Sequence, residues 1–205
     1  LNGSSIGTTS ITGPGAGSAN VTFNGSGAVT VAGAVGTNIG TVTVSNSNGT
    51  AFQSTVNAAN VVISNTAAGQ TVDFAGNLTV GTAMSAATGT GAYNVAIRGA
   101  SNSIAGATAT SFANTGTVTL GDNGDATTFA NGVTHTTGPT SINGTVTATA
   151  GAVNFGATSL IGTINATGAG GAINTASLAG NGTTDTLNGG SISTGPVTLV
   201  SGDTL

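Results

Sequence analysis

The chain has 205 residues, and few of its side chains can do acid–base or metal chemistry near neutral pH. They are Arg98, His135 and five aspartates: Asp73, Asp122, Asp125, Asp185 and Asp203. General acid–base catalysis needs a positioned pair of carboxylates or a histidine. The aspartates are widely separated except for Asp122 and Asp125, and one arginine without any lysine offers little to bind a uronate. The sequence therefore predicts no catalytic residue and no enzyme.

The segment Gly121-Asp-Asn-Gly-Asp-Ala126 is the best local motif for a ligand. Asp122, Asn123 and Asp125 offer the side-chain oxygens that Ca²⁺ prefers. The chain has no glutamate to complete an EF-hand loop, and the segment is not the Gly-Gly-x-Gly-x-Asp repeat of calcium-binding β-rolls. Two interpretations stay open: a solvated turn, which we favour, and a weak calcium site. No other cofactor or metal is indicated.

The remaining ionisable residues are expected on the surface. His135 has no partner histidine or cysteine with which to bind zinc, and we expect it to be exposed. Arg98 and Asp73 alternate with apolar neighbours and should point into solvent, but the sequence alone does not pair them. A formal net charge of −4 argues against binding to nucleic acid, which needs basic residues to neutralise phosphates.

The composition favours an ordered all-β protein. Charged residues make up 3% of the chain, against about 25% in ordinary globular domains. The 36 glycines and the many Thr, Ser and Asn residues are unfavourable inside helices. A mean hydropathy of +0.30 argues against disorder. No apolar stretch approaches the roughly 18 residues of a membrane-spanning helix, so we expect no membrane span.

Short strands are indicated by apolar residues at positions i and i+2, repeated between turns. The pairs are Val21/Phe23, Val29/Val31, Val42/Val44, Val61/Ile63, Val72/Phe74, Leu78/Val80, Val95/Ile97, Val118/Leu120, Val153/Phe155 and Val197/Leu199. Asn-Gly, which marks tight turns, occurs at Asn24, Asn48, Asn123, Asn131, Asn143, Asn181 and Asn188. The pattern runs from end to end, so residues 1–205 are interpreted as one continuous β-repeat region, processed or excised from a longer repetitive chain.

Two architectures fit these strands: a β-solenoid, specifically a right-handed parallel β-helix, and a β-sandwich. Aromatic residues make up only 3% of the chain, and no Trp is available to centre a sandwich. Val, Ile, Leu and Ala suit stacked coils, and Asn, Ser and Thr at the turns suit hydrogen-bonded ladders between coils. We therefore prefer the solenoid. At about 20 residues per coil and ~4.8 Å per coil, it would have about ten coils and a length of ~50 Å.

Several stretches carry a family resemblance: Gly116-Thr-Val-Thr-Leu-Gly-Asp122, Phe129-Ala-Asn-Gly-Val-Thr-His-Thr-Thr-Gly-Pro139 and Ser141-Ile-Asn-Gly-Thr-Val-Thr147. They resemble the repeats of giant bacterial β-strand-repeat surface proteins. They are similar to filamentous-haemagglutinin-like adhesins and autotransporter passenger domains. The resemblance implies a secreted β-helix at the cell surface, acting in adhesion or biofilm structure. It implies no shared catalytic residues.

Three hypotheses for function follow. The first is a non-catalytic structural or adhesive segment of an extracellular fibre or biofilm matrix, with surface glycans or host surfaces as partners. The second is a self-assembling filament subunit whose partners are copies of itself, joined by strand exchange or coil stacking. The Leu1-Asn-Gly-Ser-Ser-Ile6 segment is echoed by Leu187-Asn-Gly-Gly-Ser-Ile192, which fits related repeats at both ends. A β-helical polysaccharide-active enzyme is the third and least favoured.

Overall fold

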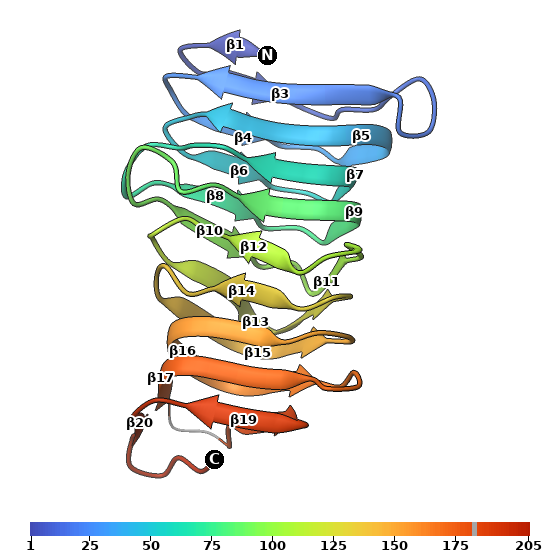
Figure 1. Ribbon diagram of the computed structural model, residues 1–205. Helices are drawn as coiled ribbons and strands as arrows, with labels where there is room; N and C mark the ends of the chain where they lie inside the picture. Colours follow the sequence, from blue (N-terminus) through green and yellow to red (C-terminus); the bar gives the residue numbers. More distant parts are fainter. Residues whose placement is uncertain (182–183) are drawn as a thin grey trace.

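The computed structural model describes residues 1–181 and 184–205, in which the chain is all-β and winds into a β-solenoid of about nine turns (Figure 1). The strands are β1 (Asn2–Gly3), β2 (Ile6–Thr8), β3 (Ala19–Gly25), β4 (Val29–Val31), β5 (Val35–Asn46), β6 (Thr50–Phe52), β7 (Val56–Ile63), β8 (Thr71–Phe74), β9 (Leu78–Ala86), β10 (Asn94–Ile97), β11 (Ser101–Ile104), β12 (Thr110–Phe112), β13 (Val118–Phe129), β14 (Val133–His135), β15 (Thr140–Ala148), β16 (Val153–Ala166), β17 (Ala172–Gly180), β18 (Thr186–Gly189), β19 (Ser191–Thr194) and β20 (Val197–Leu199). The two termini lie at opposite ends of the stack (Figure 1). The preferred prediction of a solenoid is confirmed.

Every strand pairing among the described residues is parallel, and the pairings form three faces. Face A contains β1, β3, β12, β14 and β19, together with parts of longer strands. Face B contains β2, β4, β6, β8, β10 and β20, and face C contains β11 and β18. The long strand β16 passes along all three faces in one coil. The alternative of a β-sandwich, with its antiparallel sheets, is wrong.

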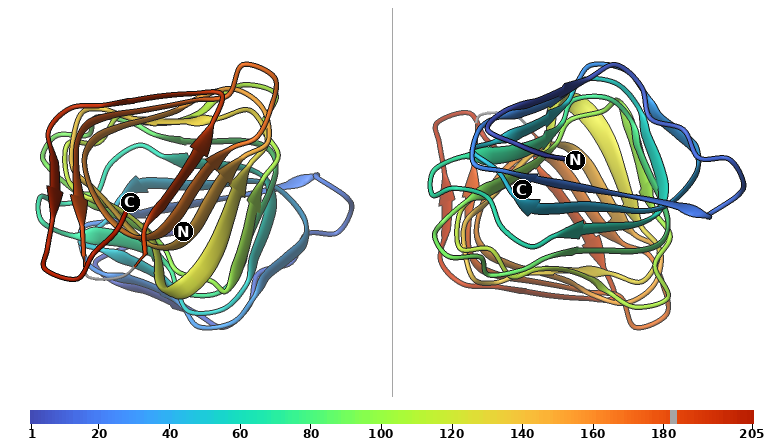
Figure 2. Two further views of the ribbon diagram at one scale, coloured as in Figure 1. Left: turned by 90° about the horizontal axis from the view of Figure 1, so that it is seen from below. Right: turned by 90° about the horizontal axis from the view of Figure 1, so that it is seen from above.

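The number of residues per coil varies, which explains why the sequence has no fixed-length consensus. Thr140 pairs with Thr158 one coil later, a step of 18 residues, whereas Ser85 pairs with Ser111, a step of 26. The extra residues lie at corners between faces, where the coil can bulge without disturbing the paired strands (Figure 2). The predicted spacing of about 20 residues was therefore close to the observed steps, and the turns number about nine instead of ten.

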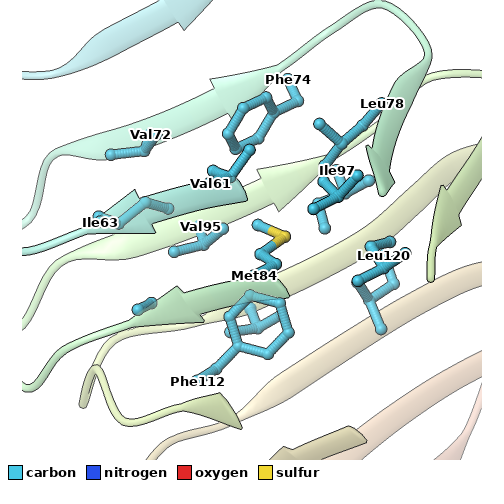
Figure 3. Close-up of a cluster of buried hydrophobic side chains, with 14 of the residues drawn as sticks. Val61, Ile63, Val72, Phe74, Leu78, Met84, Val95, Ile97, Phe112 and Leu120 are labelled. Carbon is cyan, nitrogen blue, oxygen red and sulfur yellow. The ribbon is translucent and has the colours of Figure 1, made fainter. Parts of the chain in front are cut away.

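The interior is filled by the apolar pairs that the sequence indicated. Their side chains point inward from all three faces and stack in columns, as Figure 3 shows for Val72, Phe74, Val95 and Ile97. Phe52 and Phe74 lie in successive coils with parallel rings 4.9 Å apart. Each such column removes apolar surface from water at roughly 25 cal/mol per Å². The column is thin, so small residues suffice to fill it.

The last coil is the exception to this burial. Val197 and Leu199 occupy inward positions, paired with Leu178 and Gly180 of the coil below. Each is nevertheless 42% exposed, because no coil of the chain lies over them.

Glycines occupy the corner where strand β15 turns from face B to face C. Gly144 and Gly162 are paired in successive coils and have φ values of +141° and +132°. A Cβ on Gly162 would collide with the backbone carbonyl of Gly144. The coils approach so closely here that neither position tolerates a side chain. Asn143-Gly144 is thus a corner within a continuous strand, whereas Asn131-Gly132 forms the separate turn that the dipeptide predicted. Part of the Asn181-Gly182 turn lies outside the described residues.

We predict that Gly162→Ala destabilises the fold more than Gly170→Ala. Gly170 also has positive φ (+75°), but a Cβ there meets no atom within 4 Å. Gly170→Ala should cost about 1 kcal/mol of unfolding free energy from backbone strain alone. Gly162→Ala adds a clash with a neighbouring coil and should cost about 3 kcal/mol in total. Urea titration followed by circular dichroism measures both, and equal losses would contradict the close coil approach.

Candidate functional site

Three charged side chains from successive coils meet on the outer side of face B. Arg98 follows β10 and donates from Nε and Nη2 to the two carboxylate oxygens of Asp73 in β8, at 2.9 and 2.6 Å. Its Nη1 donates to Oδ2 of Asp122 in β13, at 2.7 Å. The residues are remote in sequence but adjacent in space because each is one coil from the next. The prediction that Asp73 and Arg98 point outward is confirmed, and the structure pairs them.

This cluster is a surface ion network with modest energetic weight. Hydrogen bonds to Asp73 and then to Asp122 raise the pKa of Arg98, which is charged at all relevant pH values. The Arg98 and Asp73 side chains are 37% and 22% exposed. Solvent therefore screens the pair, and each exposed ion pair contributes about 1 kcal/mol or less. The bidentate geometry orients the guanidinium and stitches three coils together.

A shallow groove of about 380 Å³ runs beside the cluster. It is lined by Thr71, Asp73, Asn94, Ala96, Arg98, Thr117 and Thr119. The amide of Asn94 is engaged with the backbone, since Oδ1 accepts from the N–H of Thr117 and Nδ2 donates to the carbonyl of Gly69. The groove is therefore a hydroxyl-lined depression between strands and contains no aromatic side chain.

The calcium motif lies in a loop that bulges at the corner of β13. The register to β15 shifts between Leu120 and Asp125, and Gly121 and Gly124 both have φ of +79°. Oδ2 of Asp122 accepts from Arg98, and Oδ2 of Asp125 accepts from the backbone N–H of Asp122 at 3.0 Å. These contacts fit the interpretation as a solvated turn. Among residues 1–181 and 184–205, no three acidic or histidine side chains are grouped as metal ligands. Calcium binding by Asp122, Asn123 and Asp125 stays a prediction.

His135 is buried, so the expectation that it is exposed is wrong. Its Nδ1 lies 2.9 Å from Oγ1 of Thr140, and its Nε2 lies 3.1 Å from the backbone carbonyl of Asn114. The carbonyl can only accept, so Nε2 carries the proton and Nδ1 accepts from Thr140. Burial lowers the pKa of His135, and the ring packs edge-on against Phe112. The histidine is a neutral member of the core with both nitrogens occupied.

Amide side chains form ladders between coils on the outer faces. On face A, Asn174 donates to Oδ1 of Asn154 at 2.7 Å. On face C, Asn188 donates to Oδ1 of Asn165 at 2.8 Å, and Asn165 donates to Oγ1 of Thr147 at 3.4 Å. The ladders that the composition suggested therefore exist, on the strands themselves as well as at turns.

One acidic pair escaped the sequence analysis. Asp185 and Asp203 are 18 residues apart, which separated them in the sequence, but a step of that length is one coil here. The pKa of Asp185 is raised by burial, and the charge of Asp203 adds to this effect. The signal that was available was spacing: acidic residues one coil apart become neighbours.

A scan against protein-family models, a search of curated proteins and a search of solved structures each found no match. No described helix is long and apolar enough to cross a membrane. The site must therefore be interpreted from its own geometry.

We predict that acid destabilises the fold through His135. Its pKa is lower in the folded than in the unfolded chain, so the unfolded chain binds the proton more tightly. The stability is complete above the unfolded value of about 6.5 and is lost as the pH falls towards the folded pKa, by at most about 1.4 kcal/mol per pH unit. Urea midpoints measured between pH 7.5 and pH 5 should show this loss.

The matched control is His135→Phe. The neighbours of position 135 in its column are Phe112 and Phe155, so a phenyl ring fits the position. This variant should fold, although it leaves Thr140 with one hydrogen bond fewer, and should lack the contribution of His135 to the pH dependence. Identical pH profiles for the native chain and the variant would contradict the buried neutral histidine.

Proposed function

We propose that this chain is a non-catalytic structural and adhesive rod of an extracellular fibre or biofilm matrix. The observation that carries the proposal is a continuous parallel solenoid whose faces present mainly Thr, Ser, Asn and Ala. Four of the six charged side chains are Asp73, Arg98, Asp122 and Asp125, and they lie in one patch. The rest of the surface is nearly free of charge.

The non-catalytic half of the proposal is supported by how the ionisable groups are used. Arg98 is held by two carboxylates, and His135 has both nitrogens bonded inside the core. A general acid or base must reach a proton on a substrate. Neither of these groups is free to do so in this geometry.

The adhesive half rests on the outward columns of face C. Thr145 and Thr147 of β15 stand beside Thr163 and Asn165 of β16. Hydroxyl and amide groups in a regular array can exchange hydrogen bonds with a hydroxyl-rich surface, each weak but many together. An uncharged array also adds no electrostatic repulsion when rods lie side by side. The proposed partners are therefore neutral glycans and neighbouring rods.

The test is retention of the chain on a neutral polysaccharide film in a quartz crystal microbalance. The native chain should be retained and should release no reducing sugar. The Thr145→Lys/Thr147→Lys variant should be retained less, because lysine charges must be desolvated at the contact. Thr43→Lys on face A is the matched control and should behave like the native chain. Absence of retention would contradict the adhesive role, and sugar release would contradict the non-catalytic role.

A specific observation also favours the second hypothesis, a subunit that stacks end to end. The large hydrophobic side chains that are exposed in the described residues lie at the two ends: Leu1, Ile192, Val197, Leu199, Val200 and Leu205. Strand β20 has a free edge on face B, and β2 of a second copy belongs to the same face. No lysine guards either edge. Head-to-tail stacking of this kind produces open filaments.

Leu199→Lys tests this stacking, with Thr198→Lys as its control. Leu199 points inward towards the next coil, whereas Thr198 points outward. In sedimentation velocity, the native chain and Thr198→Lys should shift to larger species as concentration rises. Leu199→Lys should stay monomeric. A native chain that is monomeric at every concentration would contradict stacking and leave the rod proposal unaffected.

A further inference from the structure

The carboxyl groups of Asp185 and Asp203 converge beside Gly180 near the last coils of the solenoid. Oδ2 of Asp185 and Oδ2 of Asp203 both lie within 2.8 Å of the position that a Cβ on Gly180 would occupy. The absence of a side chain on Gly180 makes the space for this approach. Thr184 and Thr204, the neighbours of the two aspartates, are joined by a parallel bridge. The backbone therefore holds the two carboxyl groups together.

The two facing oxygens lack hydrogen-bond donors among the residues that the structure describes. Asp185 is 1% exposed, and its Oδ1 accepts from the backbone N–H of Gly162 at 2.8 Å. Oδ1 of Asp203 accepts from the N–H of Thr204 at 3.1 Å. Each Oδ2 atom, by contrast, is buried without a partner. A buried acceptor without a donor costs about 1–3 kcal/mol, and more when it is charged.

No cation is available nearby to relieve this cost. Strands β16 to β20, which surround the pair, contain no ionisable side chain, and the chain has no lysine or glutamate. Arg98 belongs to the cluster on β8, β10 and β13. The only charged side chain facing Asp185 is that of Asp203. Two like charges so close and so shielded cannot both be ionised without a large penalty.

We propose that Asp185 and Asp203 form a proton-binding site in which one shared proton joins the two Oδ2 atoms and secures the last coil. One proton satisfies both unpartnered atoms at once: it is covalently bound to one carboxyl group and donated to the other. No further ligand is required. This inference is independent of the proposed adhesive role.

The direction of the pH dependence follows from the raised pKa of Asp185. The folded chain binds the proton more tightly than the unfolded chain does. The added stability is fully present below the unfolded aspartate value of about 3.9, and is lost as the pH rises through the folded pKa. The last coil should therefore be held more firmly in mild acid, which is the opposite of the effect of His135 on the whole fold.

Hydrogen exchange of peptides from residues 184–205 tests the site. The measurement uses the full chain at pH 4.5 and 7.5, corrected for intrinsic exchange rates, in the His135→Phe background. The parent should show protection several-fold higher at pH 4.5 than at pH 7.5. Asp203→Asn keeps the shape and supplies a permanent amide donor to Asp185. This variant should be well protected at both pH values.

Asp125→Asn is the matched control, because Asp125 lies in the β13 corner loop, away from the pair. It should retain the pH difference of the parent. Three outcomes would overturn the proposal. The first is equal protection of the parent at both pH values. The second is low protection of Asp203→Asn at both. The third is restoration by Ca²⁺ of protection in the parent at pH 7.5, which would make the pair a cation site.

Discussion

Main-chain hydrogen bonding from each coil to the next is the constraint on which the rest of the structure depends. Parallel pairing brings the backbones of successive coils to ~4.8 Å and repeats along three faces. At the corners this distance leaves no room for a Cβ, so Gly144 is paired with Gly162. On the faces it stacks like side chains in columns, with apolar groups inside and amides or hydroxyls outside. Charged columns would repel one another at that spacing, which gives a physical reason for the 3% charge.

The same spacing explains what the sequence could and could not predict. Alternation identified the strands, because Val72/Phe74 and Val95/Ile97 show which residues face inward without knowledge of their partners. Partners depend on the length of each coil, which varies from 18 to 26 residues between the Thr140–Thr158 and Ser85–Ser111 pairs. Arg98 with Asp73, and Asp185 with Asp203, were therefore invisible as pairs. His135 was avoidable as an error, because it is in phase with Val133 and thus in an inward position.

The polar groups divide into those that hold coils together and those that remain available. Asn154, Asn165 and Arg98 each bond to a neighbouring coil and stiffen the stack. The hydroxyls of Thr145 and Thr147 face outward and are free to meet another surface. This division supports a passive rod whose partners are met by many weak contacts. It also places the unusual chemistry, a buried carboxyl pair, where it affects the firmness of the last coil and not the outer faces.

The most direct test of the solenoid is distance measurement between spin labels on one outward column of face B. The chain has no native cysteine, so labelled cysteines can be placed at Thr30 and at Thr119, Ser159 or Ala179 in turn. The register from Thr30 through Ala51, Asp73, Ala96, Thr119, Ser141 and Ser159 to Ala179 is continuous. Double electron–electron resonance should give backbone separations that grow by ~4.8 Å per coil, to ~34 Å for Thr30 and Ala179. Distances that do not increase along this series would contradict the stacked parallel coils.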